Sequence, residues 1–171
     1  MSNFSVLVQA AEILEYSKNR AEIRYMELKI KLADSELDHK NILLIRREVF
    51  IKEQQIPVEI EIDENEENST YIIAYLNFKA VGTARWRQSV NGVKLERFAV
   101  LKKYRKKGIG TALTNFIIAH IPKEKTIYLN SQKPAIGFYE RLGFVSVGSF
   151  FKEADIAHQK MVYQRKSFKK A

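Results

Sequence analysis

The residues with the clearest chemical potential lie in the middle of the chain, where a strand-like segment gives way to a helix-like one. Residues 95–100 alternate as a β-strand does, and from Ile109 apolar residues recur at three- and four-residue steps. The first N–H groups of a helix have no intrahelical partner, and glycine lets an anion approach them closely. We therefore predict a basic diphosphate-binding loop, made of Arg105, Lys106, Lys107, Gly108, Ile109, Gly110 and Thr111, with Lys102 and Lys103 beside it.

Two better-known phosphate-binding motifs do not fit this loop. A Walker loop ends in a Lys-Ser/Thr pair after its second glycine, and no such pair follows Gly110. A dinucleotide fingerprint needs a third glycine, where this chain has Leu113. What remains is Arg-x-x-Gly-x-Gly at a strand-to-helix junction. The alternative interpretation is a basic loop whose glycines only cap a helix.

This motif resembles the signature of the GNAT superfamily, the acyl-CoA-dependent N-acyltransferases, which is Arg/Gln-x-x-Gly-x-Gly/Ala in the same setting. Three other segments resemble the ElaA-like subgroup. They are residues 47–63, which contain Arg-Glu-Val-Phe-x-x-Glu-Gln, residues 128–144, which begin Tyr-Leu-Asn-Ser-Gln, and residues 151–161, which read Phe-x-Glu-x-x-Ile-x-His-x-x-Met. The resemblance covers about residues 23–163. It departs from the subgroup near Tyr71, where a histidine is usual.

The resemblance implies acetyl-CoA as the cofactor, with its pyrophosphate on the glycine loop. The backbone of Phe98, Ala99 and Val100 would then pair with the pantetheine arm as an additional strand. The N–H of Val100 would face the thioester oxygen, as an oxyanion-hole donor does. Asn130 and Phe138, on the matching strand and helix, complete the predicted cofactor site.

Tyr139 is the predicted general acid, because the family often has a tyrosine here that protonates the departing CoA sulfur. A phenol can give its proton to a thiolate as charge develops in the transition state. The alternative is that Phe138 and Tyr139 are ordinary packing aromatics.

Two residues are candidates for the base that takes the proton of the amine. Glu96 shares strand parity with Phe98 and Val100, which predicts that all three lie on one face of the strand. His158 matches the C-terminal motif and carries an imidazole, which accepts protons near neutral pH. The alternatives are a solvated strand glutamate paired with Lys94 or Arg97, and a structural histidine.

Acceptor recognition is predicted for three polar residues of the first-helix segment and its connector, namely Glu53, Gln54 and Asp63. They would recognise a cationic or polar amine, or else only cap and solvate their segments. The chain has no cysteine, so no acyl-cysteine intermediate can form and direct attack in a ternary complex is expected. No metal is expected in the site.

The elements that must position these residues follow from periodicity and turn residues. We expect helices at 2–17, from Asp34 or Ser35 to about 55, at 109–120 and from Pro134 to Gly143, with an acidic connector at 57–69. Strands are expected at 23–32, 71–78, 80–88, 93–100, 126–129, 144–151 and 158–163, with a hairpin turn at Asn91-Gly92. By resemblance this order implies an α/β GNAT fold, a mixed and mostly antiparallel central sheet flanked by helices, with an extra N-terminal helix. The predicted divisions are an N-terminal helical extension at 1–20, the acyltransferase domain at 21–164 and a basic tail at 165–171.

The composition sets the outer limits of the function. The chain has 171 residues, 46% of them hydrophobic, which suits one domain with a sizeable core. Its formal net charge of +9 implies an anionic partner. The first thirty residues do not look like a signal peptide and no apolar run is long enough to span a bilayer, so a cytoplasmic protein without a membrane partner is expected.

Three functional hypotheses follow. The first is an N-acetyltransferase that moves an acetyl or other short acyl group from acetyl-CoA to a primary amine, on a small molecule or a peptide. The second is an acyl-CoA-binding sensor or interaction domain without transferase activity. The third, a nucleic-acid binder, rests on net charge alone and lacks any recognised motif, so we expect no nucleic-acid partner. The N-terminal helix is expected to be a packing appendage or the contact of a homodimer, and the alternative is a role in substrate binding.

Overall fold

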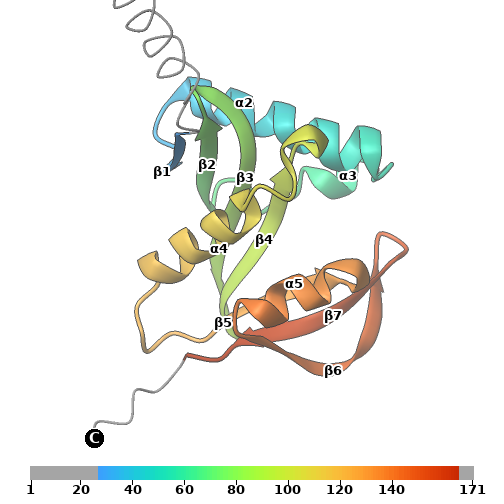
Figure 1. Ribbon diagram of the computed structural model, residues 1–171. Coiled ribbons are helices and arrows are strands. Elements are labelled where there is room, and N and C mark those ends of the chain that lie inside the picture. The colour runs from blue at the N-terminus through green and yellow to red at the C-terminus, as the bar shows by residue number, and fades with distance from the viewer. Residues whose placement is uncertain (1–26, 166–171) are drawn as a thin grey trace, which may run out of the picture.

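The computed structural model describes residues 27–165, which form one seven-stranded sheet in the order β1-β2-β3-β4-β5-β7-β6 (Figure 1). Within this range β4 and β5 pair in parallel, and the five other neighbouring pairs are antiparallel. The strands are β1 Leu28–Leu32, β2 Thr70–Leu76, β3 Lys79–Ser89, β4 Gly92–Val100, β5 Ile127–Gln132, β6 Phe144–Glu153 and β7 Ile156–Tyr163. The mixed, mostly antiparallel sheet confirms the predicted fold class. The predicted N-terminal helix, the start of the first strand and most of the basic tail lie outside the described residues.

Helices cover both faces of this sheet (Figure 1). They are α2 Glu36–Arg46, the π-helix Arg47–Glu53, α3 Val58–Glu61, α4 Ile109–His120 and α5 Ile136–Arg141, with 3₁₀ turns at Lys102–Tyr104 and Lys133–Ala135. On one face, Leu113 and Ile117 of α4 join Ala84 and Leu95 of the sheet in the largest apolar core. On the other face, Ile45 of α2 packs with residues of the π-helix and the sheet in a smaller core. The sheet is thus the middle layer of three.

The first long helix begins as expected and ends differently. Ser35 caps α2 through a reciprocal capping box with Asp38, in which the Ser35 hydroxyl accepts from the Asp38 N–H at 3.2 Å. After Arg46 the helix widens, and the N–H of Gln54 donates to the carbonyl of Val49 at 3.2 Å. π-helical turns of this kind often occur at functional sites. The acidic connector also contains α3, a short helix that the sequence analysis did not predict.

The turn between β3 and β4 lies one residue earlier than predicted, at Val90 and Asn91, with Ser89 opposite Gly92. Gly92 has φ of 117°, in the region that favours glycine. A Cβ at this position would lie 2.4 Å from the carbonyl oxygen of Thr126, at the start of the neighbouring strand. Glycine therefore lets β4 and the segment leading into β5 approach closely at this point.

A β-bulge in β4 decides which side chains share a face. Thr83 of β3 lies opposite Ala99, but Arg85, two residues on, lies opposite Glu96, so β4 contains one extra residue. Arg97, within this bulge, has φ of 56°. The prediction that Glu96 shares a face with Phe98 and Val100 is therefore wrong. Phe98 and Val100 pack against the core under α4, and Glu96 lies on the opposite face, because one inserted residue reverses the alternation.

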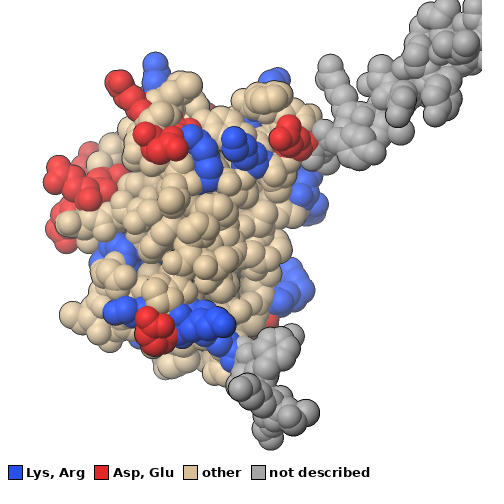
Figure 2. Space-filling view, turned by 90° about the vertical axis from the view of Figure 1, so that its left-hand side faces the viewer, with Lys and Arg blue, Asp and Glu red and all other residues tan. Residues whose placement is uncertain are grey.

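The surface carries its charges in separate groups. On the face shown in Figure 2, Lys and Arg side chains stand apart from one another around a centre formed largely by uncharged residues. Among the described helices, none is long and apolar enough to cross a membrane.

Candidate active site

The site lies where β4 and β5 separate. The two strands pair only from Val93 to Leu95, opposite Ile127 to Leu129, although β4 continues to Val100 and β5 to Gln132. A cleft of about 480 Å³ opens between them. Its lining includes Phe98 and Tyr139 from the side of α5, and Glu96 from the opposite face of the sheet. The cleft therefore reaches both faces, and it exposes the backbone edges that the strands present to each other.

The N-terminus of α4 stands on the face that Phe98 occupies. Gly108 is the N-cap residue with φ of 78°, and no side chain caps the helix. The carbonyl of Gly108 accepts the N–H of Ala112 at 2.9 Å, so the amide groups of residues 109–111 precede the first intrahelical bond. A Cβ at Gly108 would meet nothing within 4 Å, and Lys106 and Lys107 beside it are exposed. These features suit an anion at the helix end.

Phe138 of α5 lies against this helix end. A Cβ at Gly110 would lie 3.3 Å from the Cζ of Phe138, so glycine allows α4 and the aromatic ring to approach. The glycine loop and α5, which lies beside the opposite strand of the cleft, are thereby brought next to each other.

Arg105 and Glu53, which were predicted to bind different ligands, bind each other. The guanidinium of Arg105 donates to both carboxylate oxygens of Glu53 at 2.6 and 2.7 Å, and its Nε donates to the carbonyl of Val100 at 2.9 Å. The paired guanidinium lowers the pKa of Glu53. Glu53 is not among the residues that line the cleft. The pair ties the basic loop to the end of β4 and to the π-helix.

Tyr139 lies in the wall of the cleft on the α5 side. Its ring is 7% exposed and packs edge-on against three aromatic neighbours, with centroid distances of 5.9 Å to Phe98, 4.8 Å to Phe138 and 5.7 Å to Phe144. Burial raises the pKa of the Tyr139 phenol, which therefore keeps its proton at neutral pH.

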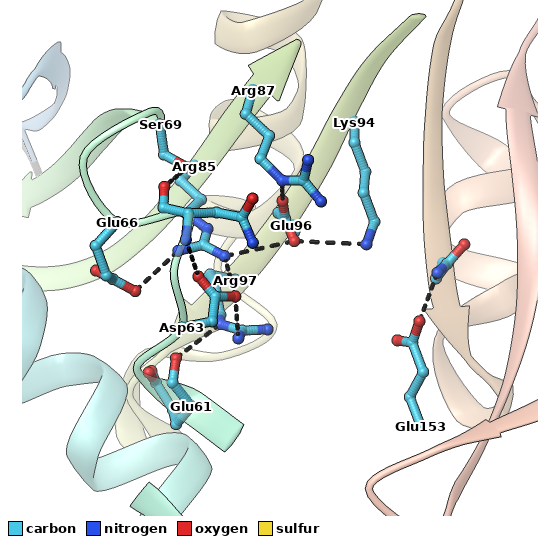
Figure 3. Close-up of polar contacts among 12 residues, drawn as sticks. Glu61, Asp63, Glu66, Ser69, Arg85, Arg87, Lys94, Glu96, Arg97 and Glu153 are labelled. Carbon is cyan, nitrogen blue, oxygen red and sulfur yellow. Dashed lines mark hydrogen bonds and ion pairs between the residues drawn. The ribbon is translucent and has the colours of Figure 1, made fainter. Parts of the chain in front are cut away.

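Glu96 is surrounded by cations (Figure 3). Its Oε1 accepts from Nε of Arg87 at 2.5 Å, and its Oε2 lies 3.5 Å from Nη2 of Arg85 and 3.6 Å from Nζ of Lys94. The side chain is 10% exposed. Both carboxylate oxygens are thus occupied by ion pairs, of the kind considered as the alternative to a base, although Arg87 was not expected as the main partner.

His158 lies in the other wall of the cleft, on β7. Its ring is 8% exposed and stacks on Phe151, and its Nδ1 is 2.9 Å from the carbonyl oxygen of Ile156. A carbonyl only accepts hydrogen bonds, so Nδ1 carries the proton and Nε2 of the neutral ring is the acceptor. This tautomer leaves an acceptor nitrogen on a residue of the cleft wall.

A buried charged network supports the face on which Glu96 lies. Arg46 and Arg85 are 2% and 0% exposed. Arg46 binds the Glu61 carboxylate through two nitrogens, and both arginines bind Glu66 and the hydroxyl of Tyr71. Although burial would raise the pKa of Glu66, hydrogen bonds from Arg46 and Tyr71 lower it to about 2. The network therefore keeps Glu66 charged.

Asp63, predicted to recognise the acceptor, belongs to this network. Its Oδ2 accepts from Arg85 at 2.6 Å and from Arg97 at 2.8 Å (Figure 3). Burial opposes ionisation, but the bond from Arg85 lowers the pKa of Asp63. The acidic run at 57–69 was predicted to be a polar connector, because its arginine partners lie fifteen or more residues away. The sign of this charged network in the sequence itself was Arg85, a charged residue in the middle of an apolar strand.

Two amide contacts complete the cleft. The side-chain Oε1 of Gln54 accepts from Nε2 of Gln132 at 3.0 Å, which links the end of the π-helix to the end of β5. Nδ2 of Asn130, a predicted cofactor contact, donates to Oε1 of Glu153 at 2.7 Å. Gln54, Gln132, Asn130 and Glu153 all line the cleft.

Comparisons with known proteins identify the family of this chain. A family model described as an acetyltransferase (GNAT) domain matches residues 15–165, and the chain belongs to this family. YjcF of Bacillus subtilis (strain 168), named as an uncharacterized N-acetyltransferase, is 37% identical over 138 residues, which are 79% of this chain and 99% of that protein. The structure of an acyl-CoA N-acyltransferase from Pseudomonas aeruginosa has a TM-score of 0.70 and 25% identity, covering 81% of this chain and 99% of that one. Escherichia coli ElaA has the same fold, with a TM-score of 0.71, 24% identity and the same coverage.

Proposed function

We propose that this GNAT protein is an N-acetyltransferase that transfers an acetyl or other short acyl group from acetyl-CoA to a primary amine, by direct attack in a ternary complex. The observation that carries the proposal is the separation of β4 and β5 after three residue pairs, which opens a cleft through the sheet beside Tyr139. Cofactor and amine would then meet from opposite faces of one sheet.

The residues around α4 fit acetyl-CoA. The space at Gly108 is open, the helix end is uncapped, and the edge of β4 from Phe98 to Val100 has no paired strand on the β5 side. Lys106, Lys107 and the amides of residues 109–111 would hold the pyrophosphate. The β4 edge would pair with the pantetheine amides, and the Val100 N–H would donate a hydrogen bond to the thioester oxygen. Arg105 would position this loop through Glu53 and Val100.

Acetyl-CoA, when bound, supplies an acyl carbon on which an N–C bond forms and a C–S bond breaks, while the amine loses one proton and the CoA thiolate gains one. Tyr139 lines the cleft and would donate the proton to the sulfur, and burial of the phenol, which raises its pKa, keeps it protonated beforehand. Nε2 of His158 is the better placed acceptor for the amine proton, because Nδ1 is committed to the Ile156 carbonyl. Glu96 holds Arg87 and Lys94 in position instead.

The test begins with thermal unfolding in the presence of acetyl-CoA, with sodium pyrophosphate at equal ionic strength as the control. A ligand at 100 times its Kd stabilises the native state by about 2.7 kcal/mol. A panel of amines is then followed by release of free CoA thiol, with initial rates at varied concentrations of both substrates.

We expect a selective shift with acetyl-CoA and intersecting reciprocal plots, as for a ternary complex. A shift without turnover of any amine would favour the acyl-CoA sensor instead. Parallel plots would contradict direct attack, and an unchanged melting curve would remove the acyltransferase function altogether.

A further inference from the structure

Building on the proposed acyltransferase function, we infer that the acceptor is an amine that also carries a carboxylate, as amino acids do. Glu153 would hold its ammonium group, and Lys94 would hold its carboxylate. The basis is the distribution of charge over the cleft, where one carboxylate and one ammonium group have charge left unbalanced by the protein.

Most carboxylates in the cleft are already neutralised. Glu61 is bound by Arg46, and Glu96 by Arg87 at 2.5 Å. Asp63 is bound by two guanidinium groups. An arriving ammonium group would have to compete with these guanidinium partners. Asp63, which was predicted to help recognise a cationic or polar acceptor, therefore has little negative charge left for one.

Glu153 differs from these carboxylates. It lines the cleft from the last residue of β6, its side chain is exposed, and its Oε1 accepts from the neutral amide of Asn130 at 2.7 Å. Within residues 27–165, no Lys or Arg forms an ion pair with it. Its charge is therefore available to a ligand, and the Asn130 amide orients the carboxylate without neutralising it.

Lys94 carries a positive charge that the protein balances only in part. Arg85, at 3.5 Å from Glu96, is also bound by Asp63 and Glu66. Arg87 and Lys94 therefore share the single carboxylate of Glu96, and Lys94, at 3.6 Å, is the more distant of the two. Its side chain is 18% exposed and lines the cleft. A ligand anion beside Lys94 would balance its positive charge, whereas a ligand cation there would be repelled.

The sheet places these two residues on the same face. Lys94 lies opposite Tyr128 in the parallel β4–β5 pair, and Asn130 follows Tyr128 by two residues. Alternate residues of a strand share a face, so the Asn130–Glu153 pair stands diagonally across the gap from Lys94. Figure 3 shows Lys94 between Glu96, to which its ammonium group is joined, and the Glu153 side chain. A short molecule with opposite charges at its two ends matches this arrangement.

The experiment compares three acceptors of matched length with the full chain and saturating acetyl-CoA: 5-aminopentanoate, its carboxamide and 1,5-diaminopentane. We expect the highest kcat/KM for the aminocarboxylate and the lowest for the diamine. The substitution Lys94→Gln should lower the ratio of aminocarboxylate to carboxamide by about tenfold, the size of one lost charge-assisted hydrogen bond. Glu153→Gln should raise KM for all three acceptors.

The matched controls are Lys125→Gln and Glu124→Gln, two exposed residues between α4 and β5 that do not line the cleft. Thermal unfolding with and without acetyl-CoA checks that each variant folds and binds cofactor. Equal kcat/KM for the carboxamide or the diamine, or an unchanged ratio in Lys94→Gln, would overturn this inference while leaving the transferase intact. If acetyl-CoA binds and no amine of a broad panel reacts, the proposed function fails first and the inference with it.

Discussion

At the scale of single residues, surroundings separate the candidate catalytic groups. Tyr139 and His158 line the cleft with one polar atom each suited to proton transfer, while both oxygens of Glu96 are held by cations. The family resemblance indicated Tyr139 and His158, and strand parity indicated Glu96. The difference comes from Arg87, which the register of β3 on β4 brings to Glu96, and from the carbonyl of Ile156, two residues before His158 in β7.

The role of Tyr139 is tested by removing its hydroxyl group alone. Tyr139→Phe should lower kcat by about 100-fold, the lower range of general acid catalysis, because no other donor of the described cleft replaces the phenol. The stabilisation by acetyl-CoA should stay at the wild-type value, since the ring still packs against Phe98 and Phe144. Steady-state kinetics and thermal unfolding measure the two quantities.

Tyr163→Phe serves as the control, because this tyrosine also packs against Phe144 but does not line the cleft. An undiminished kcat in Tyr139→Phe would make Tyr139 a packing aromatic, the alternative considered from the sequence.

At the scale of secondary structure, the important features are two irregularities. The bulge at Arg97 turns Phe98 toward Tyr139 and Glu96 toward the charged network. The left-handed Gly108 starts α4 without a side-chain cap, which leaves its first amide groups available. The bulge therefore sets the faces of two side chains, and the glycine exposes the backbone amides of the helix end.

Gly108 provides a direct test of this backbone requirement. Gly108→Val should lower the free energy of unfolding by about 1–2 kcal/mol, because a β-branched residue is strained at φ of 78°. Gly108→Asn should cost less, since asparagine tolerates the left-handed conformation. The space around the glycine is open, so strain rather than a clash distinguishes the two variants. Urea denaturation measures both, and equal losses would show that the left-handed conformation is not retained.

At the scale of the whole molecule, a buried charged network joins the helical layer to the sheet. Arg46 at the end of α2 and Arg85 in β3 share Glu66 and Tyr71, which come from the connector and β2. Removing one partner from such a network leaves a buried charge uncompensated, which destabilises proteins strongly. The network therefore makes the face around Glu96 dependent on the connector.

The depressed pKa of Glu66 predicts acid sensitivity. The folded chain holds this carboxylate ionised down to about pH 2, while the unfolded chain protonates it near 4.5. The unfolded state thus binds more protons in this window, and stability falls as the pH drops from about 4.5 toward 2. This group alone accounts for up to about 3 kcal/mol. Urea unfolding at pH 7, 5, 4 and 3 measures the loss.

Glu66→Gln should be less stable than the wild type at pH 7, with a difference that shrinks on acidification because proton uptake by Glu66 in the unfolded wild type lowers the wild-type stability. Glu124→Gln, which changes an exposed carboxylate, should follow the wild-type curve. A constant difference between Glu66→Gln and the wild type from pH 7 to pH 3 would contradict the depressed pKa.

Features set by near neighbours were predictable from the chain itself. The capping of α2 by Ser35 depends on residues three positions apart, and β2 and β3 are two successive runs, largely apolar at their centres, joined by a short turn. The start of α4 at Gly108 follows from local apolar spacing and a backbone that suits glycine. Such signals also carried the family resemblance, which the comparisons confirm.

Tertiary structure alone decided how distant segments meet. The face on which Glu96 lies depends on one extra residue in β4, which alternation along a single strand does not reveal. The pairing of Arg105 with Glu53, and of Asp63 with Arg85, joins residues 52 and 22 positions apart. The cleft exists because β4 and β5 part after three pairs, and strand pairing is a property of two segments together.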